Sequence, residues 1–264
     1  MSHERILWLG GSHRRHLFYA ATLARALPLV GGLMQVREEV VPPVPQGLKN
    51  IDRSNWLKHF RERYQAEEKY FGDPSKPDIP LLEVDGLTLN DTDSVEFVKD
   101  MKPDLAVIFG TGMIRDPLKS ALPKDTINLH LGLSPRYRGA ATLFWPFYFL
   151  EPNFAGTTFH YIEHSPDAGD IIHQVRPVLE KGDGIHDVAC KAVVASAVEA
   201  VALFQMDEWQ KFKQKPEAGK NFLAGDFQPK HLRMIYQVFD NDMVDAYLSG
   251  EIKPKEPNLK RQFP

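Results

Sequence analysis

A strand that ends in a loop of glycine, serine and proline carries two polar residues suited to acyl transfer. Residues 127–139 read Ile-Asn-Leu-His-Leu-Gly-Leu-Ser-Pro-Arg-Tyr-Arg-Gly, and apolar residues alternate with Asn128 and His130. Residues two apart in an extended segment share a face, so the carboxamide and the imidazole point the same way. An amide can hold a developing oxyanion while an imidazole moves a proton. The alternative is a polar pair that only faces solvent.

The same stretch resembles a known signature. Asn-x-His followed by Pro-x-Tyr-Arg-Gly resembles the formyltransferases that use 10-formyltetrahydrofolate, which act on glycinamide ribonucleotide, methionyl-tRNA or nucleotide sugars. The family's second element, an Asp-x-Gly turn, is matched by Asp167 in Pro-Asp-Ala-Gly-Asp. The resemblance runs from Pro103 to His173. It implies that Asn128, His130 and Asp167 are the catalytic residues.

These three residues have distinct expected roles. Attack of an amine on a formyl carbon creates an oxyanion, which Asn128 and a protonated His130 can stabilise. His130 also titrates in the range needed to relay the proton from the amine to the folate nitrogen. Asp167 would orient His130 or a bridging water and favour the imidazolium, or it is a plain turn residue. Asp170 closes the same turn and is expected to be structural.

The loop after His130 departs from the family pattern. The family reads His-x-Ser-Leu-Leu-Pro, and here Gly132 replaces the serine and Ser134 replaces a leucine. The catalytic residues are unchanged, so we expect a differently shaped loop on the substrate side. Arg136 and Arg138 are candidate ligands for a substrate phosphate or carboxylate, or they are surface charge.

The resemblance also assigns the folate site. A wholly apolar segment at 105–109 is typical of a buried parallel strand, and a glycine-containing turn follows it. The alternative is that these glycines only allow a tight turn. The residues assigned to folate binding are Gly112, Met113, Ile114, Arg115, Ser165 and Pro166.

The N-terminal region predicts a βαβ unit and a parallel sheet. Strand patterns at 5–10 and 29–36 flank a helical pattern at 13–26. The Gly-x-Gly-x-x-Gly fingerprint is missing, so NAD is not expected. The first turn joins a helix N-terminus to basic side chains, which favours an anion, and the resemblance suggests a phosphate or nucleotide-sugar site there. A solvated basic helix start is the alternative. The residues concerned are Gly11, Ser12, His13 and Arg14.

The remaining patterns complete an α/β, Rossmann-like fold with a mostly parallel sheet, an antiparallel edge and helices on both faces. A helix is expected at 55–70, capped by Ser54, within an inserted segment near 50–75. A second helix is capped by Asn90 or Asp91 and ends near Met101, and a third, at 140–150, bends at Pro146. Further helices are expected at 185–212, 229–238 and 242–249. A small hairpin is expected at 79–89, and strands at 157–162 and 171–178 form the antiparallel edge. We expect a catalytic domain at 1–215 and a short C-terminal extension at 216–264.

Composition narrows the class of protein. The chain has 264 residues, 43% of them hydrophobic, and a net charge of −3, which gives no reason to expect a nucleic acid partner. A lone cysteine, Cys190, excludes an internal disulfide and fits a reducing cytoplasm. No signal peptide or membrane span is expected, so the predicted location is cytoplasmic, with no membrane partner.

The acceptor is the least constrained part of the prediction. We expect a primary amine on a small molecule, most readily an amino sugar linked to a nucleotide, because the extension is too short for the barrel domain of methionyl-tRNA formyltransferases. Another small amine, and a homodimer, are left open. Formyltetrahydrofolate hydrolase is the rival activity, and a non-catalytic binding module is disfavoured by the intact catalytic residues.

A metallohydrolase is the third alternative to formyl transfer. It would draw on a histidine-rich run, although residues four apart on a strand lie too far apart to share one zinc. No metal is expected. The run consists of His160, His164, Asp167, Asp170 and His173.

Overall fold

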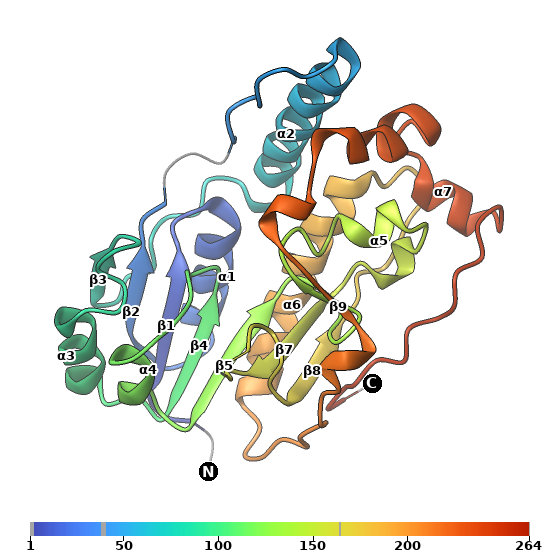
Figure 1. The fold of residues 1–264 in the computed structure, drawn as a ribbon. Coiled ribbons are helices and arrows are strands. Elements are labelled where there is room, and N and C mark those ends of the chain that lie inside the picture. The colour runs from blue at the N-terminus through green and yellow to red at the C-terminus, as the bar shows by residue number, and fades with distance from the viewer. Residues whose placement is uncertain (1–2, 38–40, 164, 264) are drawn as a thin grey trace.

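One mixed sheet with helices on both faces forms the body of the molecule (Figure 1). The computed structural model describes residues 3–37, 41–163 and 165–263. The strands of this sheet, in chain order, are β1 (Ile6–Gly11), β2 (Leu29–Gln35), β3 (Leu81–Val84), β4 (Leu105–Phe109), β5 (Asp125–His130), β7 (Thr157–Tyr161) and β8 (Ile171–Val175). Their spatial order is β3-β2-β1-β4-β5-β7-β8. All pairs from β3 to β5 are parallel, and β7 pairs antiparallel with β5 and with β8. The predicted parallel sheet with an antiparallel edge is confirmed.

The apolar strands bury both faces of the sheet. One face packs against α1 (Arg14–Ala24) and α6 (Ile185–Phe204), and the other packs against α3 (Thr92–Met101) and α4 (Leu118–Ala121). Neighbouring residues of β1 show the alternation, because Ile6 belongs to the first core cluster and Leu7 to the second. The sheet therefore holds the ends of β4 and β5 rigidly between two layers of helices.

Two other parts of the chain lie beyond the carboxyl ends of the strands. α2 (Asn50–Phe71) rises above β1 and β2 and lies beside the C-terminal segment (Figure 1). Arg233 makes a bidentate ion pair with Asp52 of α2, at 2.7 Å for each nitrogen. Gln237 Nε2 donates to Asn55 Oδ1 at 3.0 Å. The C-terminal segment is thus fastened to α2 across the top of the sheet.

The rest of the chain forms short elements. β6 (Tyr137–Gly139) pairs in parallel with β9 (Lys220–Phe222), and both are followed by aromatic residues that join a common core. The other short elements are α5 (Trp145–Tyr148), α7 (Met243–Leu248), a π-helix at Met234–Val238 and 3₁₀ turns at Pro152–Phe154, Pro216–Ala218, Ala224–Asp226 and Pro229–His231.

Two predicted helix boundaries are wrong. α2 begins at Asn50 with Lys49 as its N-cap, so Ser54 lies inside the helix. Asp52 occupies the first turn, where its charge favours the helix start and its partner Arg233 fixes it. The helix predicted at 140–150 is only Trp145–Tyr148, because Pro146 tolerates only the first turn of a helix.

Two further predictions are corrected. The hairpin at 79–89 is wrong, because β3 pairs in parallel with β2 and Asp85 Oδ1 accepts from the backbone N–H groups of Leu87 and Thr88 at 2.8 Å, forming a turn that leads into α3. α6 ends at Phe204 and not near 212, because the chain turns back and Phe212 pairs with Ile171. In the described part of the chain, no helix combines the length and apolar character needed to cross a membrane.

Candidate active site

The end of β5 and the turn before β8 bring the three predicted catalytic residues together. Asn128 and His130 lie on β5, and His130 Nδ1 lies 3.3 Å from Asp167 Oδ2. The backbone N–H of Gly139 donates to the same Asp167 oxygen at 3.0 Å. The carboxylate is therefore fixed between the imidazole and the start of the loop that follows β6.

The turn that carries Asp167 depends on its neighbours. Asp167 has φ 49°, a left-handed conformation that aspartate tolerates better than most residues. A Cβ at Gly169 would lie 1.8 Å from the carbonyl oxygen of Tyr161, so only glycine fits there. Arg138 donates to the carbonyl oxygens of Pro166 at 3.4 Å and Pro216 at 3.0 Å. Arg138 thus secures the turn that positions the Asp167 carboxylate.

His160 is a site residue that the sequence considered only as a metal ligand. It lies opposite Asn128 in the antiparallel register of β5 and β7. Its Nε2 is 3.1 Å from Asn128 Nδ2 and 3.4 Å from Asp167 Oδ1. Its Nδ1 lies 2.8 Å from the carbonyl oxygen of Tyr161, so a proton on Nδ1 leaves Nε2 to accept from the Asn128 amide. The antiparallel edge was predicted, but the register that pairs these residues was not.

Burial and charge act in opposite directions on the His130–Asp167 pair. Burial lowers the pKa of His130, and the Asp167 carboxylate opposes that shift. Burial alone would raise the pKa of Asp167, but His130 and the Gly139 N–H hold that pKa well below its usual value. His130 Nε2 also lies 3.0 Å from the carbonyl oxygen of Tyr137. The site is therefore a charged carboxylate beside a buried imidazole whose two ring nitrogens face Asp167 and the carbonyl oxygen of Tyr137.

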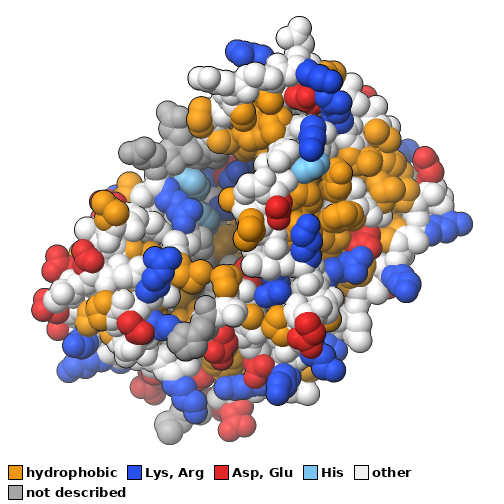
Figure 2. All heavy atoms as spheres, viewed as in Figure 1, with side chains coloured by type: hydrophobic (Ala, Val, Ile, Leu, Met, Phe, Trp, Pro, Cys, Tyr) orange, Lys and Arg blue, Asp and Glu red, His pale blue; other side chains and the backbone are white. Residues whose placement is uncertain are grey.

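Two cavities lie on either side of this pair. A smaller cavity of about 190 Å³ reaches Asn128 and Asp167, and a larger one of about 430 Å³ reaches His130. Figure 2 shows a hollow in this face of the molecule, with histidine and basic side chains beside it. The contact between His130 and Asp167 crosses the wall between the two cavities.

The smaller cavity collects most of the residues assigned to folate binding. Gly112, Met113, Ile114, Ser165 and Pro166 line it, together with Ile108, Thr111, Ile162, Glu163 and His160. The backbone N–H of Gly112 donates to Gln35 Oε1 at 2.6 Å, which fixes the turn after β4. Arg115 is not among the lining residues of the described chain, and its backbone N–H donates to Asn90 Oδ1 at 2.8 Å.

The residues assigned to the acceptor lie elsewhere. Among the described residues, Gly11, Ser12, His13, Arg14 and Arg136 line neither of these two cavities. Ser12 Oγ accepts from the backbone N–H of Arg37 at 2.9 Å, and the Arg14 guanidinium lies 4.7 Å from the ring centre of Tyr64. Arg136 forms an ion pair with Glu151, and Arg138 secures the Asp167 turn. None of these contacts tests the predicted binding roles.

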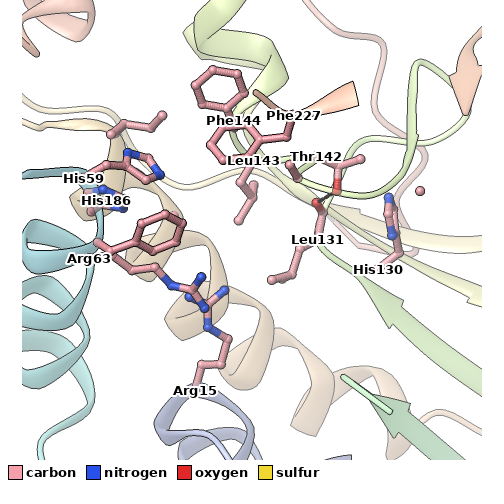
Figure 3. Close-up of a pocket in the computed structure, with 15 residues that line it drawn as sticks. Arg15, His59, Arg63, His130, Leu131, Thr142, Leu143, Phe144, His186 and Phe227 are labelled. Atoms are coloured by element: carbon pink, nitrogen blue, oxygen red, sulfur yellow. Dashed lines mark hydrogen bonds between the residues drawn. The ribbon is translucent and has the colours of Figure 1, made fainter. Parts of the chain in front are cut away.

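The larger cavity contains side chains that the sequence did not single out. Arg15 of α1 and Arg63 of α2 point into it, with His59 and His186 beside them and His130 at the opposite side (Figure 3). The apolar lining residues are Phe60, Leu131, Ala141, Leu143, Phe144, Ile185, Ala189 and Phe227. The spacing of His59 and Arg63 on one helix face was a usable signal, but nothing local indicated what α2 covers.

The metal alternative gains no support from the described residues. In ranges 3–37, 41–163 and 165–263, no group of three His, Cys, Asp or Glu side chains is arranged to hold a metal ion. His164 lies outside the described residues. His173 is buried and its Nε2 lies 2.6 Å from Glu199 Oε2, which gives it a structural partner.

Comparison with known proteins places these observations in a family. The family model described as "Formyl transferase" matches residues 62–197. Methionyl-tRNA formyltransferase of Geobacter sulfurreducens is 30% identical over 175 residues, covering 65% of this chain and 52% of that protein. The same enzyme of Bacteroides fragilis is 30% identical over 110 residues, covering 42% and 33%. The chain thus spans about half, or less, of the length of these relatives.

Solved structures show the same fold at low sequence identity. A sugar N-formyltransferase from a Shewanella species has a TM-score of 0.54 at 14% identity, covering 88% of this chain and 87% of that one. A 4-N formyltransferase from Francisella tularensis has 0.53 at 16%, covering 85% and 78%. A phosphoribosylglycinamide formyltransferase from Anaplasma phagocytophilum has 0.53 at 18%, covering 76% and 86%. With the family match over residues 62–197, this chain belongs to the formyl transferase family.

Proposed function

We propose that this protein transfers the formyl group of 10-formyltetrahydrofolate to a primary amine of a small acceptor, an amino sugar linked to a nucleotide. One observation carries the proposal. The catalytic pair His130 and Asp167, 3.3 Å apart, stands between two cavities, so a donor on one side and an acceptor on the other would meet at it. A site for group transfer between two bound molecules needs this arrangement.

The smaller cavity suits the donor. Its walls combine the apolar side chains of Ile108, Ile114 and Ile162 with the backbone of the turn after β4. A flat, polar-edged pterin ring is held by such a mixture of apolar faces and main-chain hydrogen bonds. The bound donor would supply an activated formyl group next to Asn128.

Asn128 and His130 would stabilise the negative charge that develops on the formyl oxygen. His160 already orients the Asn128 amide from the neighbouring strand, at 3.1 Å. A hydrogen-bond donor that is already oriented before the reaction needs no reorganisation when the negative charge appears. The carboxamide is therefore expected to contribute to the rate and little to acceptor binding.

His130 and Asp167 would move the proton. Burial lowers the pKa of His130 and so favours the neutral imidazole. With Nε2–H donating to the carbonyl oxygen of Tyr137, Nδ1 is the nitrogen that would accept the proton that the attacking amine loses. The Asp167 carboxylate then stabilises the imidazolium. In the complete reaction, a carbon–nitrogen bond to the acceptor forms, the bond from the formyl carbon to folate N10 breaks, and N10 receives the proton.

The larger cavity suits a sugar-sized acceptor. Aromatic side chains such as Phe144 and Phe227 can pack on a sugar ring, and the imidazoles of His59 and His186 can bond its hydroxyls. One of the solved structures of similar fold is named as a sugar N-formyltransferase, which supports this choice of acceptor.

The proposal is tested by incubating the protein with 10-formyltetrahydrofolate and a panel of nucleotide-linked amino sugars. We expect release of tetrahydrofolate that depends on one amine, with the N-formyl product detected by mass spectrometry. Glycinamide ribonucleotide and methionyl-tRNA serve as competing acceptors. Release of formate at the same rate with no amine present would show that the protein is a hydrolase and not a transferase.

A further inference from the structure

The larger cavity contains a pair of guanidinium groups whose side chains come from different helices. Arg15 lies in the first turn of α1, and Arg63 lies in the middle of α2. Figure 3 shows the two guanidinium groups side by side, both directed into the cavity, with His130 across from them. The exposed fraction of the Arg15 side chain is 14%, and that of Arg63 is 26%.

A single carboxylate serves both arginines. Arg63 Nε is 2.9 Å from Glu67 Oε1, and Arg15 contacts the same oxygen through Nη2. The Glu67 side chain is 3% exposed and is not among the residues that line the cavity in the described chain. The Glu67 carboxylate therefore lies behind the two guanidinium groups, which face the cavity. Together the three side chains carry a net charge of +1.

The surroundings do not cancel this excess. No Asp or Glu among the described residues lines the cavity. Burial, His186 and Arg63 lower the pKa of His59 well below its usual value, and burial with Arg63 and Arg15 lowers the pKa of His186 to about 3, so these two side chains add no positive charge near pH 7. Arg63 stays charged, although burial and Arg15 lower its pKa to about 10. Arg14, on the next position of α1, lies against Glu68 at the rim, at 3.7 Å.

A purely structural ion pair would not need this arrangement. Two like charges beside one carboxylate repel one another, and partly desolvated charges are costly unless their hydrogen bonds are complete. Arg15 Nε is buried and has no hydrogen-bond partner among the described residues. Arg63 uses Nε for Glu67, and Figure 3 shows its guanidinium directed into the cavity. An oxyanion in the cavity would accept hydrogen bonds from the guanidinium nitrogens that face it and balance the excess charge.

We propose that Arg15 and Arg63 bind a carboxylate or phosphate group of the formyl acceptor, which places the acceptor amine at His130. This inference rests on the proposed function, because the acceptor is defined by the reaction at His130. Guanidinium groups bind planar and tetrahedral oxyanions through paired hydrogen bonds. The apolar side chains of Leu131 and Leu143 lie between the two ends of the cavity, where the carbon skeleton of the acceptor would pack.

Binding of simple anions tests the site without any reaction. Isothermal titration at constant ionic strength would follow inorganic phosphate and, separately, acetate. We expect one of them to bind with a dissociation constant in the millimolar range, and which of the two binds more tightly distinguishes a phosphate acceptor from a carboxylate acceptor. Arg63→Met should weaken that binding about tenfold, close to 1.4 kcal/mol. The matched control is Arg61→Met, which removes an exposed guanidinium from the same helix and should change binding less than about twofold.

Glu67→Gln separates a binding site from a structural ion pair, because the two predict opposite results. Removing the shared carboxylate frees both guanidinium groups, so we expect phosphate or acetate to bind several times more tightly. Circular dichroism would verify that each variant is folded. Equal binding by wild type, Arg63→Met and Glu67→Gln would overturn the inference, and so would the lack of binding of either anion to the wild type.

Turnover separates this inference from the proposed function. Glucosamine, glucosamine 6-phosphate and 2-amino-2-deoxyglucuronate form a series that differs in the anionic group. We expect a charged amine to be formylated at least tenfold more efficiently than glucosamine, and Arg63→Met to remove that preference. Formylation with no charge preference would overturn the anion site and leave the proposed function. Arg63-dependent anion binding with no formylation of any amine, including the nucleotide-linked panel, would support the anion site and contradict the proposed function.

Discussion

The two cavities that meet at His130 differ in charge and in the parts of the chain that build them. Among the described residues, the smaller cavity is lined by Glu163 and Asp167 and by no Lys or Arg, whereas the larger one is lined by Arg15 and Arg63 and by no Asp or Glu. The smaller cavity uses only residues between Ile108 and Asp167, all within the segment that matches the family.

The larger cavity combines residues of the matched segment, such as Arg63 and His130, with residues from α1, from the start of α2 and from the C-terminal segment. Arg15, His59 and Phe227 all lie outside the residues matched by the family model. The proposed donor side therefore lies wholly within the matched segment, whereas the proposed acceptor side extends beyond it.

The largest expected effect comes from His130→Ala, because this residue lines the larger cavity and contacts Asp167, which lines the smaller one. We expect the rate of tetrahydrofolate release with the acceptor to fall roughly 10²–10⁴-fold, the usual contribution of a positioned acid–base group. His231→Ala is the matched control, because His231 lines neither of the two cavities among the described residues. A near-normal rate in a folded His130→Ala protein would show that His130 takes no part in the reaction.

The residues around the smaller cavity could be predicted from the sequence. Period-two alternation around Asn128 and His130, and the Asp-x-Gly turn at Asp167, are local patterns, and the structure brings these residues together. The parallel sheet and its antiparallel edge followed from the order of apolar segments. Such features are encoded within a few neighbouring residues, so periodicity and turn chemistry are sufficient to find them.

The residues of the larger cavity could not be predicted in the same way. Arg15, Arg63 and Phe227 meet only because α2 folds over the sheet and the C-terminal segment is fastened to it through Arg233 and Asp52. Contacts between residues so far apart in the chain leave no local pattern. For the same reason His160 was missed, since strand register decides that it lies opposite Asn128.

The second largest effect is expected for Asn128→Ala, which alters only the donor side. Loss of one oxyanion donor costs about 2.7–4 kcal/mol, so kcat should fall roughly 10²–10³-fold. The KM for the acceptor should stay within about twofold, because Asn128 lines the smaller cavity. Steady-state kinetics with the acceptor varied at saturating donor would measure both values. A large rise in the acceptor KM with unchanged kcat would contradict the division between the cavities.

Acid should destabilise the acceptor side through His186. Its pKa in the folded protein is about 3, below the usual value, so its neutral form contributes stability that is lost as the pH falls below about 6.5. Between about pH 7 and about pH 5 this loss amounts to roughly 2 kcal/mol. Urea unfolding at the two pH values should show that His186→Gln loses less stability than the wild type. Equal losses in the two proteins would show that His186 is protonated freely in the folded state.

A smaller effect is expected from a pair of substitutions, one in each cavity. Phe227→Ala removes apolar packing from the larger cavity and should raise the acceptor KM about tenfold, with the donor KM unchanged. Met113→Ala in the smaller cavity should do the reverse by a few-fold, because Met113 is 43% exposed. Each variant is the control for the other. If both variants changed the KM of the same substrate, the two cavities would not bind different substrates.

A crystal structure of the protein with tetrahydrofolate tests the central claim most directly. The account predicts that the pteridine lies against the backbone of Met113 and Ile114, with N10 beside Asn128 and the His130–Asp167 pair. The larger cavity, with Arg15 and Arg63, would then remain available to the acceptor. Tetrahydrofolate bound between Arg15 and Arg63, with its N10 remote from Asn128, would contradict it.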